Sequence, residues 1–294
     1  MTGQPNLGFI GIGLMGEAVT RRLLDRGYAV TVWNLEPERL HTVVPHGARP
    51  VASPAAVTDA SDIVLMCVLH TAAVEACAFG PNGIAETARP GKLLVDLSTA
   101  DPAATRDFAA RLKRETGMGW VDAPVSGGPP AARDGTMTVM AGGGAEDIER
   151  IRSLMGEMAA NFSHMGPSGA GQTTKMINQA IVGTGYVLMA EALVLAERAG
   201  IDAALLPECL AGGHADSNLL RKLYPQMQKR DFEPPRSYAR QLLKDMKAVK
   251  NFAHGLDLML PVVECAAKRY AHYVEQGNEM ADSASVVRLY DRER

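Results

Sequence analysis

The sequence alternates short β-rich runs with helical patterns from Asn6 to about Met165, and this alternation constrains the fold more than any other feature. The β-rich runs are Leu7–Ile10, Val30–Trp33, Ile63–Val68, Leu93–Asp96, Trp120–Asp122, Thr136–Met140 and Phe162–His164. The helical segments between them carry end signals, such as Gly27 after the first helix and the Asp101-Pro102 pair before a later one. Strands and helices that alternate at this spacing predict an α/β fold with a doubly wound, mostly parallel sheet covered on both faces.

The β-rich runs disappear after the glycine turn at residues 169–171. The next pattern is a helix from about Gln172 to Ala199, about 40 Å long at 1.5 Å per residue, which is too long to cover a sheet in a small domain. Further helical stretches follow at Ala203–Leu210, Asn218–Gln228, Tyr238–His254, Pro261–Glu275 and Ser283–Arg292. We therefore expect an α/β domain at residues 1–165 and an all-helical domain at residues 166–294, joined by a long interdomain helix.

Composition and charge exclude several classes of partner. The chain has 294 residues, which suits two domains, and 30 Lys and Arg against 33 Asp and Glu give a net charge of −3. Without an excess of positive charge, neither nucleic acid nor an anionic membrane surface is an expected partner. The seven histidines show no HxxxH spacing, and the cysteines form no CxxC pair, so no metal site is expected. The four cysteines are Cys67, Cys77, Cys209 and Cys265.

The N-terminal sequence and the pattern of cysteines predict a cytoplasmic location. The N-terminus lacks the basic start, apolar run and cleavage site of a signal peptide, and the scattered cysteines suit reduced thiols. Only Met176–Ala196 is apolar enough to resemble a membrane span, and it contains Asn178, Gln179 and Glu191. Such polar groups would be costly in hydrocarbon, so a helix buried between protein surfaces is the better interpretation.

A glycine motif follows the first predicted strand directly and opens the first predicted helix. Gly11, Gly13 and Gly16 have the GxGxxG spacing of a Rossmann-type dinucleotide site. In such sites the first glycine permits the tight turn, the second lets the backbone approach the pyrophosphate, and the third allows close packing of helix on strand. Leu14 and Met15 complete the turn, so all five residues are predicted to bind the cofactor.

The end of the second strand leaves the choice between NAD and NADP open. NAD sites usually carry Asp or Glu there, and NADP sites have a nearby Arg for the 2′-phosphate. This chain has Asn34, Leu35 and Glu36 instead. Asn34 can still hydrogen-bond a ribose, Leu35 cannot bind phosphate, and Glu36 would repel one if it points inward. Arg39 could reach across, so the preference for NAD is slight.

Two further segments carry candidate substrate groups. Ser126, Gly127 and Gly128 lie just after a strand, at the edge where open α/β sheets bind ligands, and they offer a hydroxyl and backbone amides suited to a small carboxylate. Lys175 and Asn178 lie three residues apart at the start of the long helix and share one of its faces. A helical lysine is usually a solvated surface charge, but these two residues belong to the first turns of an apolar helix beside a predicted interdomain cleft.

With these motifs in place, the sequence resembles the β-hydroxyacid dehydrogenase family, which includes 3-hydroxyisobutyrate dehydrogenase, tartronate semialdehyde reductase and glyoxylate or succinic semialdehyde reductases. Five ordered segments spread over nearly the whole chain carry the resemblance. They are GFIGIGLMG at Gly8–Gly16, DLST at Asp96–Thr99, DAPVSGG at Asp122–Gly128, GAGQTTKMIN at Gly169–Asn178 and LLKDM at Leu242–Met246.

The resemblance implies a role for each matching residue. Lys175 corresponds to the general acid and base, and Asn178 to its partner at the substrate oxygen. The Ser126, Gly127 and Gly128 segment corresponds to the carboxylate cradle. Thr99 corresponds to a residue at the nicotinamide side. From the helical domain, Lys244 and Asp245 correspond to residues that close over the cofactor and the substrate. Because Gln179 follows Asn178, the resemblance leaves open which of these two amides contacts the substrate.

The expected reaction is hydride transfer between NAD or NADP and a short β-hydroxy acid or semialdehyde. Lys175 would stabilise the developing alkoxide and protonate it. Within the family, the segment KMINQAIV from Lys175 to Val182 and the tail Gln276–Asp282 look most like the tartronate semialdehyde type, with 3-hydroxyisobutyrate oxidation or glyoxylate and succinic semialdehyde reduction as alternatives. Imine reduction on the same architecture would usually replace the lysine, and a non-catalytic relative would have lost the lysine or the SGG segment.

A homodimer or homotetramer is also expected. Apolar residues recur on the helical domain, both on the long helix and near the C-terminus, and apolar faces left over after domain packing usually contact a partner subunit. The residues concerned are Leu188, Leu193, Leu195, Leu258, Leu260, Val262 and Val263.

Overall fold

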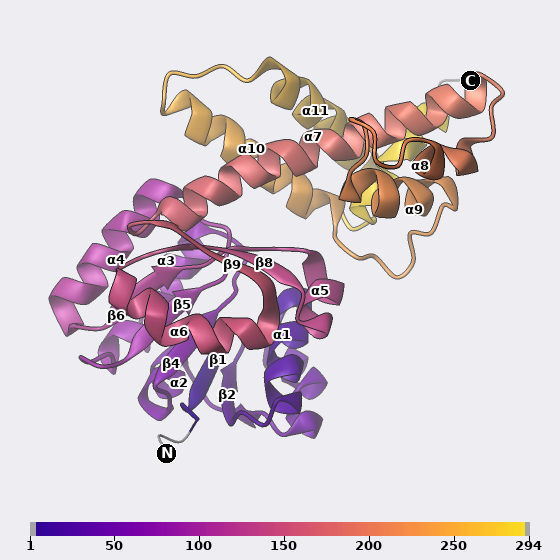
Figure 1. Cartoon of the computed structure of the whole chain (residues 1–294). Helices are drawn as coiled ribbons and strands as arrows, with labels where there is room; N and C mark the ends of the chain where they lie inside the picture. Colours follow the sequence, from indigo (N-terminus) through magenta and orange to yellow (C-terminus); the bar gives the residue numbers. More distant parts are fainter. Residues whose placement is uncertain (1–3, 292–294) are drawn as a thin grey trace. The chain divides into compact units, whose positions relative to one another are not determined.

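The structure of the chain is a computed structural model, and it describes residues 4–291 (Figure 1). The chain divides into two compact units, Met1–Lys175 and Met176–Arg294, which we call the α/β unit and the helical unit. Each has a hydrophobic core of its own.

The α/β unit is built on a sheet of nine strands within the described residues. The strands are β1 (Leu7–Ile10), β2 (Val30–Trp33), β3 (Arg49–Pro50), β4 (Ile63–Met66), β5 (Leu93–Asp96), β6 (Gly119–Asp122), β7 (Val125–Ser126), β8 (Met137–Gly142) and β9 (Ala159–Gly166). They are ordered β3-β2-β1-β4-β5-β6-β8-β7, and β9 pairs with β8. The first six of these positions have the strand order 3-2-1-4-5-6 of dinucleotide-binding sheets.

The parallel register brings the strand ends to one edge of the sheet. The last residues of five adjacent strands are aligned with one another, namely Ile10, Trp33, Met66, Asp96 and Asp122. The segments that follow these strands therefore begin side by side, which is where a dinucleotide site is expected.

The mostly parallel sheet that the sequence predicts is confirmed, with one departure at its far side. β8 runs antiparallel to β6 and to β7. The glycine-rich segment after β6, for which the sequence predicts no strand or helix, forms the two-residue strand β7 and the short helix α5 (Gly128–Asp134). These two elements reverse the chain before it enters β8, so the simple strand-helix-strand alternation ends there.

Helices cover both faces of the sheet, because the strand side chains alternate between two apolar layers. On β4, for example, Ile63 and Leu65 join the core beneath α1, α5 and α6, and Val64 and Met66 join the core beneath α2, α3 and α4. The helices are α1 (Leu14–Asp25), α2 (Pro54–Ala60), α3 (Thr71–Phe79), α4 (Pro102–Thr116) and α6 (Ala145–Met158), with 3₁₀ turns at Pro37–Thr42, Val44–His46 and Ile84–Glu86.

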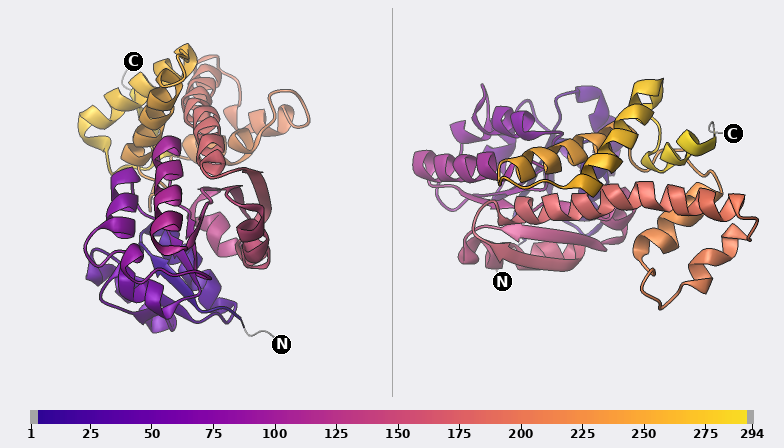
Figure 2. Two further views of the ribbon diagram at one scale, coloured as in Figure 1. Left: turned by 90° about the vertical axis from the view of Figure 1, so that its left-hand side faces the viewer. Right: turned by 90° about the horizontal axis from the view of Figure 1, so that it is seen from above.

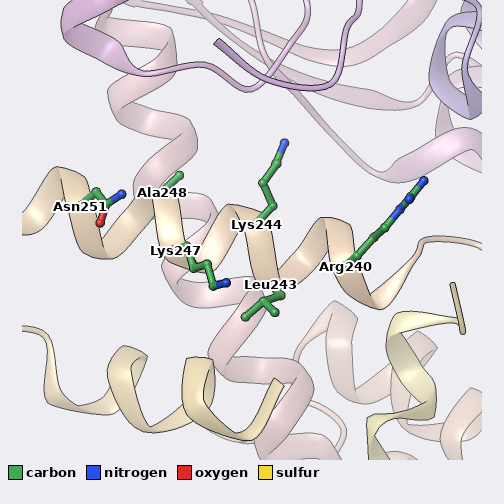
Figure 3. A pocket seen from close by; sticks show the side chains of 6 residues that line it. All are labelled: Arg240, Leu243, Lys244, Lys247, Ala248 and Asn251. Carbon is green, nitrogen blue, oxygen red and sulfur yellow. The ribbon is translucent and has the colours of Figure 1, made fainter. Parts of the chain in front are cut away.

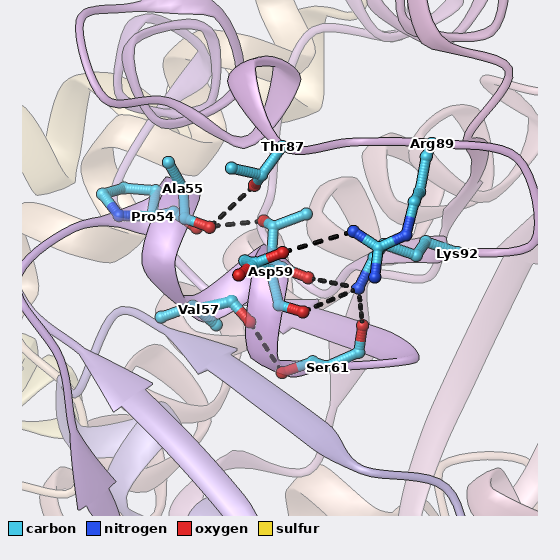
Figure 4. A network of polar contacts seen from close by, with 9 residues as sticks. Pro54, Ala55, Val57, Asp59, Ser61, Thr87, Arg89 and Lys92 are labelled. Atoms are coloured by element: carbon cyan, nitrogen blue, oxygen red, sulfur yellow. Dashed lines mark hydrogen bonds and ion pairs between the residues drawn. The ribbon is translucent and has the colours of Figure 1, made fainter.

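A buried lysine closes the C-terminal end of α2 (Figure 4). Lys92 Nζ donates to the carbonyl oxygens of Thr58 at 2.7 Å, Asp59 at 3.1 Å and Ser61. Its residue is only 6% exposed, and burial lowers the pKa of its ammonium. The last carbonyls of a helix have no partner within the helix, so this ammonium supplies donors at a helix end where the Thr58 oxygen otherwise accepts only from the Ser61 amide, at 3.3 Å.

The helical unit contains most of the long helix α7 and further helices packed against it (Figure 2). α7 spans Ala170–Arg198, close to the predicted range, and its last 23 residues belong to this unit. The remaining helices are α8 (Leu206–Cys209), α9 (Tyr224–Gln228), α10 (Ala239–His254), α11 (Pro261–Tyr273) and α12 (Arg288–Asp291). Short 3₁₀ or π turns join them at Ala203–Leu205, Leu219–Leu223, Val274–Asn278 and Ser283–Val287.

The predicted helices of this unit all begin within two residues of an observed helix or helical turn, but several are interrupted. The expected helix Ser283–Arg292 starts as a 3₁₀ turn, because the Asp282 side chain accepts a hydrogen bond from the Ala284 amide and starts the turn there. Arg292 lies outside the described residues.

Among residues 4–291, α7 is the helix with the length and mean hydropathy of a membrane span, and 39% of its most apolar window is buried. Both of its carboxylates have protein partners: Tyr290 Oη donates to Glu191 Oε1 at 2.8 Å, and Glu197 Oε2 lies 3.8 Å from Arg230 Nη2.

Candidate active site

The glycine turn after β1 has the geometry that a bound pyrophosphate requires. Gly11 has φ +97°, and a Cβ there would lie 2.3 Å from the Cys67 carbonyl oxygen. A Cβ on Gly16 would lie 1.9 Å from the Gly11 carbonyl oxygen, so both positions need glycine. A Cβ on Gly13 would meet no atom within 4 Å, which leaves room for a ligand at the start of α1. The residues present therefore fit a dinucleotide.

Leu14 and Met15 are the first two residues of α1 and are half-buried.

Asn34, at the end of β2, is buried and holds the glycine turn. Its Oδ1 accepts from the Ile12 amide at 2.7 Å, and its Nδ2 donates to the carbonyl oxygen and to Oε2 of Glu36, both at 3.0 Å. The side chain expected to contact a ribose is thus engaged within the protein. The same contacts hold the Glu36 carboxylate beside the turn.

The segment after β5 is held by Gln172 near the start of α7. Gln172 Nε2 donates to the Ser98 carbonyl oxygen at 2.8 Å, and its Oε1 accepts from the Ala100 amide at 3.0 Å. Thr99, the predicted nicotinamide-side residue, lies half-buried between these two anchored neighbours. Gln172 belongs to the GAGQTTKMIN segment, but nothing in that segment indicates that its side chain holds Ser98 and Ala100, more than 70 residues earlier in the sequence.

Asp122, at the end of β6, caps the beginning of α7. Its Oδ1 accepts from the Gly169 amide at 2.8 Å, and its Oδ2 accepts from the Gln172 amide at 3.0 Å. These amides belong to the group that a helix N-terminus leaves without partners. Burial raises the pKa of Asp122 to about 6, although the backbone hydrogen bonds act in the opposite direction.

The predicted acid and base, Lys175, lies against the segment that follows Asp122. Its Nζ donates to the Val125 carbonyl oxygen at 2.8 Å, and the residue is 7% exposed. Ser126 comes next in the chain and is half-buried, followed by Gly127 at φ +121° and Gly128 at φ +69°. The structure of the α/β unit therefore brings the lysine and the predicted carboxylate cradle together.

In the helical unit, the other predicted residues lie in one row. Asn178 Nδ2 donates to Gln179 Oε1 at 2.7 Å, and Gln179 Nε2 donates to Asp245 Oδ2 at 2.7 Å. Asp245 Oδ1 lies 3.0 Å from Lys244 Nζ. Hydrogen bonds and one ion pair thus connect Asn178 and Gln179 on α7 with Asp245 and Lys244 on α10.

Lys244 also lines a hollow of about 500 Å³ along one side of α10 (Figure 3). Arg240 and Lys244 extend toward the same side of the helix in this view, and Lys247 also lines the hollow. Three cationic groups in about two helical turns make this face attractive to an anionic ligand.

A second buried carboxyl group, on Asp96 at the end of β5, makes stability depend on pH. Burial raises its pKa from 3.8 to about 7, partly opposed by hydrogen bonds from Ser98, and its Oδ2 has no hydrogen-bond partner among the described residues. Between about pH 4 and 7 the folded protein binds a proton that the unfolded chain does not. The free energy of unfolding therefore increases as the pH falls through 7, because protonation removes the buried charge of Asp96.

We expect Asp96→Asn to raise the free energy of unfolding by about 2 kcal/mol at pH 8, at 1.4 kcal/mol per pKa unit and allowing for partial relaxation. At pH 5 the difference from wild type should be much smaller, because Asp96 is then protonated. Chemical denaturation at both pH values measures this, with Asp107→Asn, at an exposed position, as the control. A gain that is equal at both pH values would contradict the pKa assignment.

Comparison with known proteins is consistent with this geometry. Residues 6–166 match the family model described as the NAD binding domain of 6-phosphogluconate dehydrogenase. Residues 169–290 match the one described as NAD-binding of NADP-dependent 3-hydroxyisobutyrate dehydrogenase. The chain belongs to the β-hydroxyacid dehydrogenase family. It is an NAD(P)-dependent oxidoreductase, as the sequence resemblance implies.

Individual β-hydroxyacid dehydrogenases and their relatives match over nearly the full length. The chain is 34% identical over 285 residues to 2-hydroxy-3-oxopropionate reductase of Escherichia coli, with 97% of each chain covered. It is 31% identical over 287 residues to the uncharacterized oxidoreductase YkwC of Bacillus subtilis, covering 98% of this chain and 99% of the relative. A solved structure of Mycobacterium tuberculosis 3-hydroxyisobutyrate dehydrogenase with L-serine has a TM-score of 0.87 at 25% identity, covering 98% and 99%.

Proposed function

We propose that this β-hydroxyacid dehydrogenase is a tartronate semialdehyde (2-hydroxy-3-oxopropionate) reductase that uses NADH. The observation that carries the proposal is the buried Lys175 ammonium, held against Val125 beside the Ser126, Gly127 and Gly128 segment. Similarity to the E. coli reductase over nearly the full length supports the choice of substrate.

The substrate carboxylate is held by the Ser126 hydroxyl and by the amides of Gly127 and Gly128. Charge-assisted hydrogen bonds of this kind fix both position and orientation. Because this segment is continuous with Val125, to which Lys175 donates, the carboxylate and the ammonium are separated by a fixed stretch of backbone. A short acid suits this spacing, with its aldehyde carbon next to the lysine.

Lys175 supplies the proton for the reduction. The glycine turn would hold the pyrophosphate of NADH, with Thr99 at the nicotinamide side, and the bound cofactor would supply the hydride for the aldehyde carbon. The Lys175 ammonium stabilises the negative charge that develops on the carbonyl oxygen and then transfers a proton to it, giving the alcohol. In the reverse direction the neutral amine takes that proton back.

A spectrophotometric screen tests the substrate assignment. NADH and NADPH are each offered with tartronate, methylmalonate and succinic semialdehydes and with glyoxylate. The highest kcat/KM is expected for tartronate semialdehyde. An enzyme that prefers any other compound by tenfold or more would not be a tartronate semialdehyde reductase.

A 3-hydroxyisobutyrate dehydrogenase is the second candidate, and likeness to the M. tuberculosis structure favours it. Its product is methylmalonate semialdehyde, so preference for that compound in the screen would select this alternative.

The preference for NADH is predicted from Glu36. Asn34 holds the Glu36 carboxylate beside the glycine turn, and Leu35 offers no charge to a 2′-phosphate. Two like charges about 4 Å apart repel by roughly 1 to 4 kcal/mol near a protein surface, which corresponds to roughly 5- to 1,000-fold. We expect kcat/KM for NADH to exceed that for NADPH by at least about tenfold. Leu35→Arg combined with Glu36→Ala should raise kcat/KM for NADPH about tenfold.

Glu38→Ala, in the following 3₁₀ turn, is the matched control and should leave the ratio of the two cofactors unchanged. If the double variant uses NADPH no better than wild type does, Glu36 does not determine the preference.

We also propose that α7 carries a subunit contact. Of the apolar residues expected to make it, Leu193 and Val263 lie in the core instead, but Leu188 and Leu195 are 55% and 71% exposed. With Ile181 they form a stripe on one face of α7. Sedimentation at micromolar concentration should show a dimer or tetramer, and Leu188→Glu with Leu195→Glu should give a folded monomer. A monomeric wild type would contradict this.

A further inference from the structure

Thr138 on β8 lies directly across from Ser126, and neither the motifs nor the family resemblance gives it a role. β7 and β8 are antiparallel, and Ser126 pairs with Thr138. Residues directly opposite each other in such a pair point to the same face of the sheet, with Cβ atoms about 4.5 to 5.5 Å apart. Both residues are half-buried, so the two side chains lie next to each other at the predicted carboxylate cradle.

The alternation of side chains along the two strands shows which face this is. Val125 and Val139, the neighbouring pair, pack into the core beneath α1, α5 and α6. Each precedes or follows a member of the other pair by one residue. Since successive side chains of a strand point to opposite faces, Ser126 and Thr138 point away from that core.

The beginning of α7 lies on the same face as Thr138. Asp122 is paired with Gly142, which is four residues from Thr138 on β8, so the Asp122 side chain points to the face of Thr138. That side chain caps α7. One turn further along α7, Lys175 Nζ donates to the Val125 carbonyl oxygen at 2.8 Å. The ammonium therefore reaches β7 from the face on which Thr138 lies, and all of these residues belong to the α/β unit.

Thr138 is the β8 residue on this face that can exchange hydrogen bonds with a ligand through its side chain. Gly142 has no side chain, and Met140 is apolar and only 5% exposed. A hydroxyl, by contrast, both donates and accepts. In the proposed function the substrate carboxylate lies at Ser126 and the aldehyde carbon lies next to Lys175. The carbon between them, C2, is bonded to both and is therefore within reach of Thr138.

We propose that Thr138 is a specificity-determining residue that recognises the substituent on C2 of the substrate. The inference rests on the proposed function and names the group that selects its substrate. Tartronate semialdehyde carries a hydroxyl on C2, which hydrogen-bonds the Thr138 hydroxyl. Methylmalonate semialdehyde carries a methyl group there and leaves the Thr138 hydroxyl without that partner. A site built to hydrogen-bond a substrate hydroxyl discriminates against an analogue that lacks it.

Kinetics of Thr138→Val test the proposal, because valine replaces the hydroxyl by a methyl group of nearly the same volume. We expect kcat/KM for tartronate semialdehyde to fall about tenfold, the effect of one lost hydrogen bond, and kcat/KM for methylmalonate semialdehyde not to fall. Thr138→Ser keeps the hydroxyl and should keep the ratio of the two values within about threefold of wild type. A merely structural role would lower both values together, so an unchanged ratio in Thr138→Val would overturn the proposal.

Thr31→Val is the matched control. Thr31 is also a strand residue of the sheet, but it lies on β2, which is separated from β8 by β1, β4, β5 and β6. The same exchange of hydroxyl for methyl should leave the ratio of the two kcat/KM values unchanged there.

A second measurement does not depend on turnover. Glycerate, the product of tartronate semialdehyde reduction, and 3-hydroxypropionate differ only in the hydroxyl on C2, and calorimetry with NADH present gives Kd for each. Wild type should bind glycerate about tenfold more tightly, and Thr138→Val should lose that preference. No preference in wild type, or the same preference in both proteins, would overturn the proposal. If wild type reduces none of the semialdehydes, the proposed function fails, and the two Kd values still decide the role of Thr138.

Discussion

Replacing Lys175 with alanine is expected to lower kcat for semialdehyde reduction by about 10³-fold. General acid catalysis by a positioned side chain contributes about 10² to 10⁴-fold, and stabilisation of the developing alkoxide adds to it. In this chain the ammonium is 7% exposed and donates to the Val125 carbonyl oxygen at 2.8 Å. Alanine leaves no group there that could donate a proton.

Lys113→Ala is the matched control for this variant. Lys113 also donates to a backbone carbonyl oxygen, that of Gly117 at 3.2 Å, but it is exposed on α4. Its kcat should be unchanged. Titration of Lys175→Ala with NADH, followed by fluorescence, should give a Kd within about threefold of wild type, which separates loss of the proton donor from loss of the fold. Turnover of Lys175→Ala within tenfold of wild type would refute the mechanism.

Replacing Lys92 with methionine is expected to cause the largest loss of stability. Methionine fills most of the volume of the lysine stem but donates no hydrogen bond, so the carbonyl oxygens of Thr58, Asp59 and Ser61 lose their shared donor. Leaving buried polar groups unsatisfied costs about 1 to 3 kcal/mol, and the donor here is charged. We expect the free energy of unfolding of the α/β unit to fall by about 3 kcal/mol, and Tm by about 10 °C.

Arg89→Met is the control for Lys92→Met. Arg89 lies nearby and contacts the Asp59 carboxylate at 3.2 Å, but both side chains are more than half exposed (Figure 4). Exposed ion pairs contribute about 0 to 1 kcal/mol, so its Tm should change by less than about 3 °C. Calorimetry of the two variants measures the difference. Equal Tm values would show that the Lys92 contacts contribute no more than a surface ion pair.

Much of the fold could be predicted from local patterns. Four predicted strands or strand cores, among them Leu7–Ile10 and Leu93–Asp96, are observed with the same or nearly the same bounds, because the alternation of apolar runs and glycine or proline signals acts over a few residues. The predicted start of the long helix, Gln172, is two residues from the observed start of α7. The reversal after β6 was not predicted, because two residues of β7 are too few to produce a periodic signal.

For the candidate site, the residues themselves could be predicted from the sequence, but their contacts could not. Gly11, Gly16 and Lys175 could be selected from motifs, since each motif contains the residues on which its chemistry depends. Asn34 could also be selected, but its partners could not. From the sequence we expect Asn34 to hydrogen-bond a ribose, whereas in the structure its side chain hydrogen-bonds the Ile12 amide and Glu36.

Local sequence is therefore sufficient for the order of strands and helices, the glycine turn and the identity of the candidate proton donor. Tertiary packing alone decides which partner each buried polar group finds. Asp122 meets α7 across 47 to 50 residues, and Gln179 meets Asp245 across 66. Backbone preferences extend over only one or two turns, whereas a buried donor or acceptor must be satisfied by whatever the folded chain places beside it.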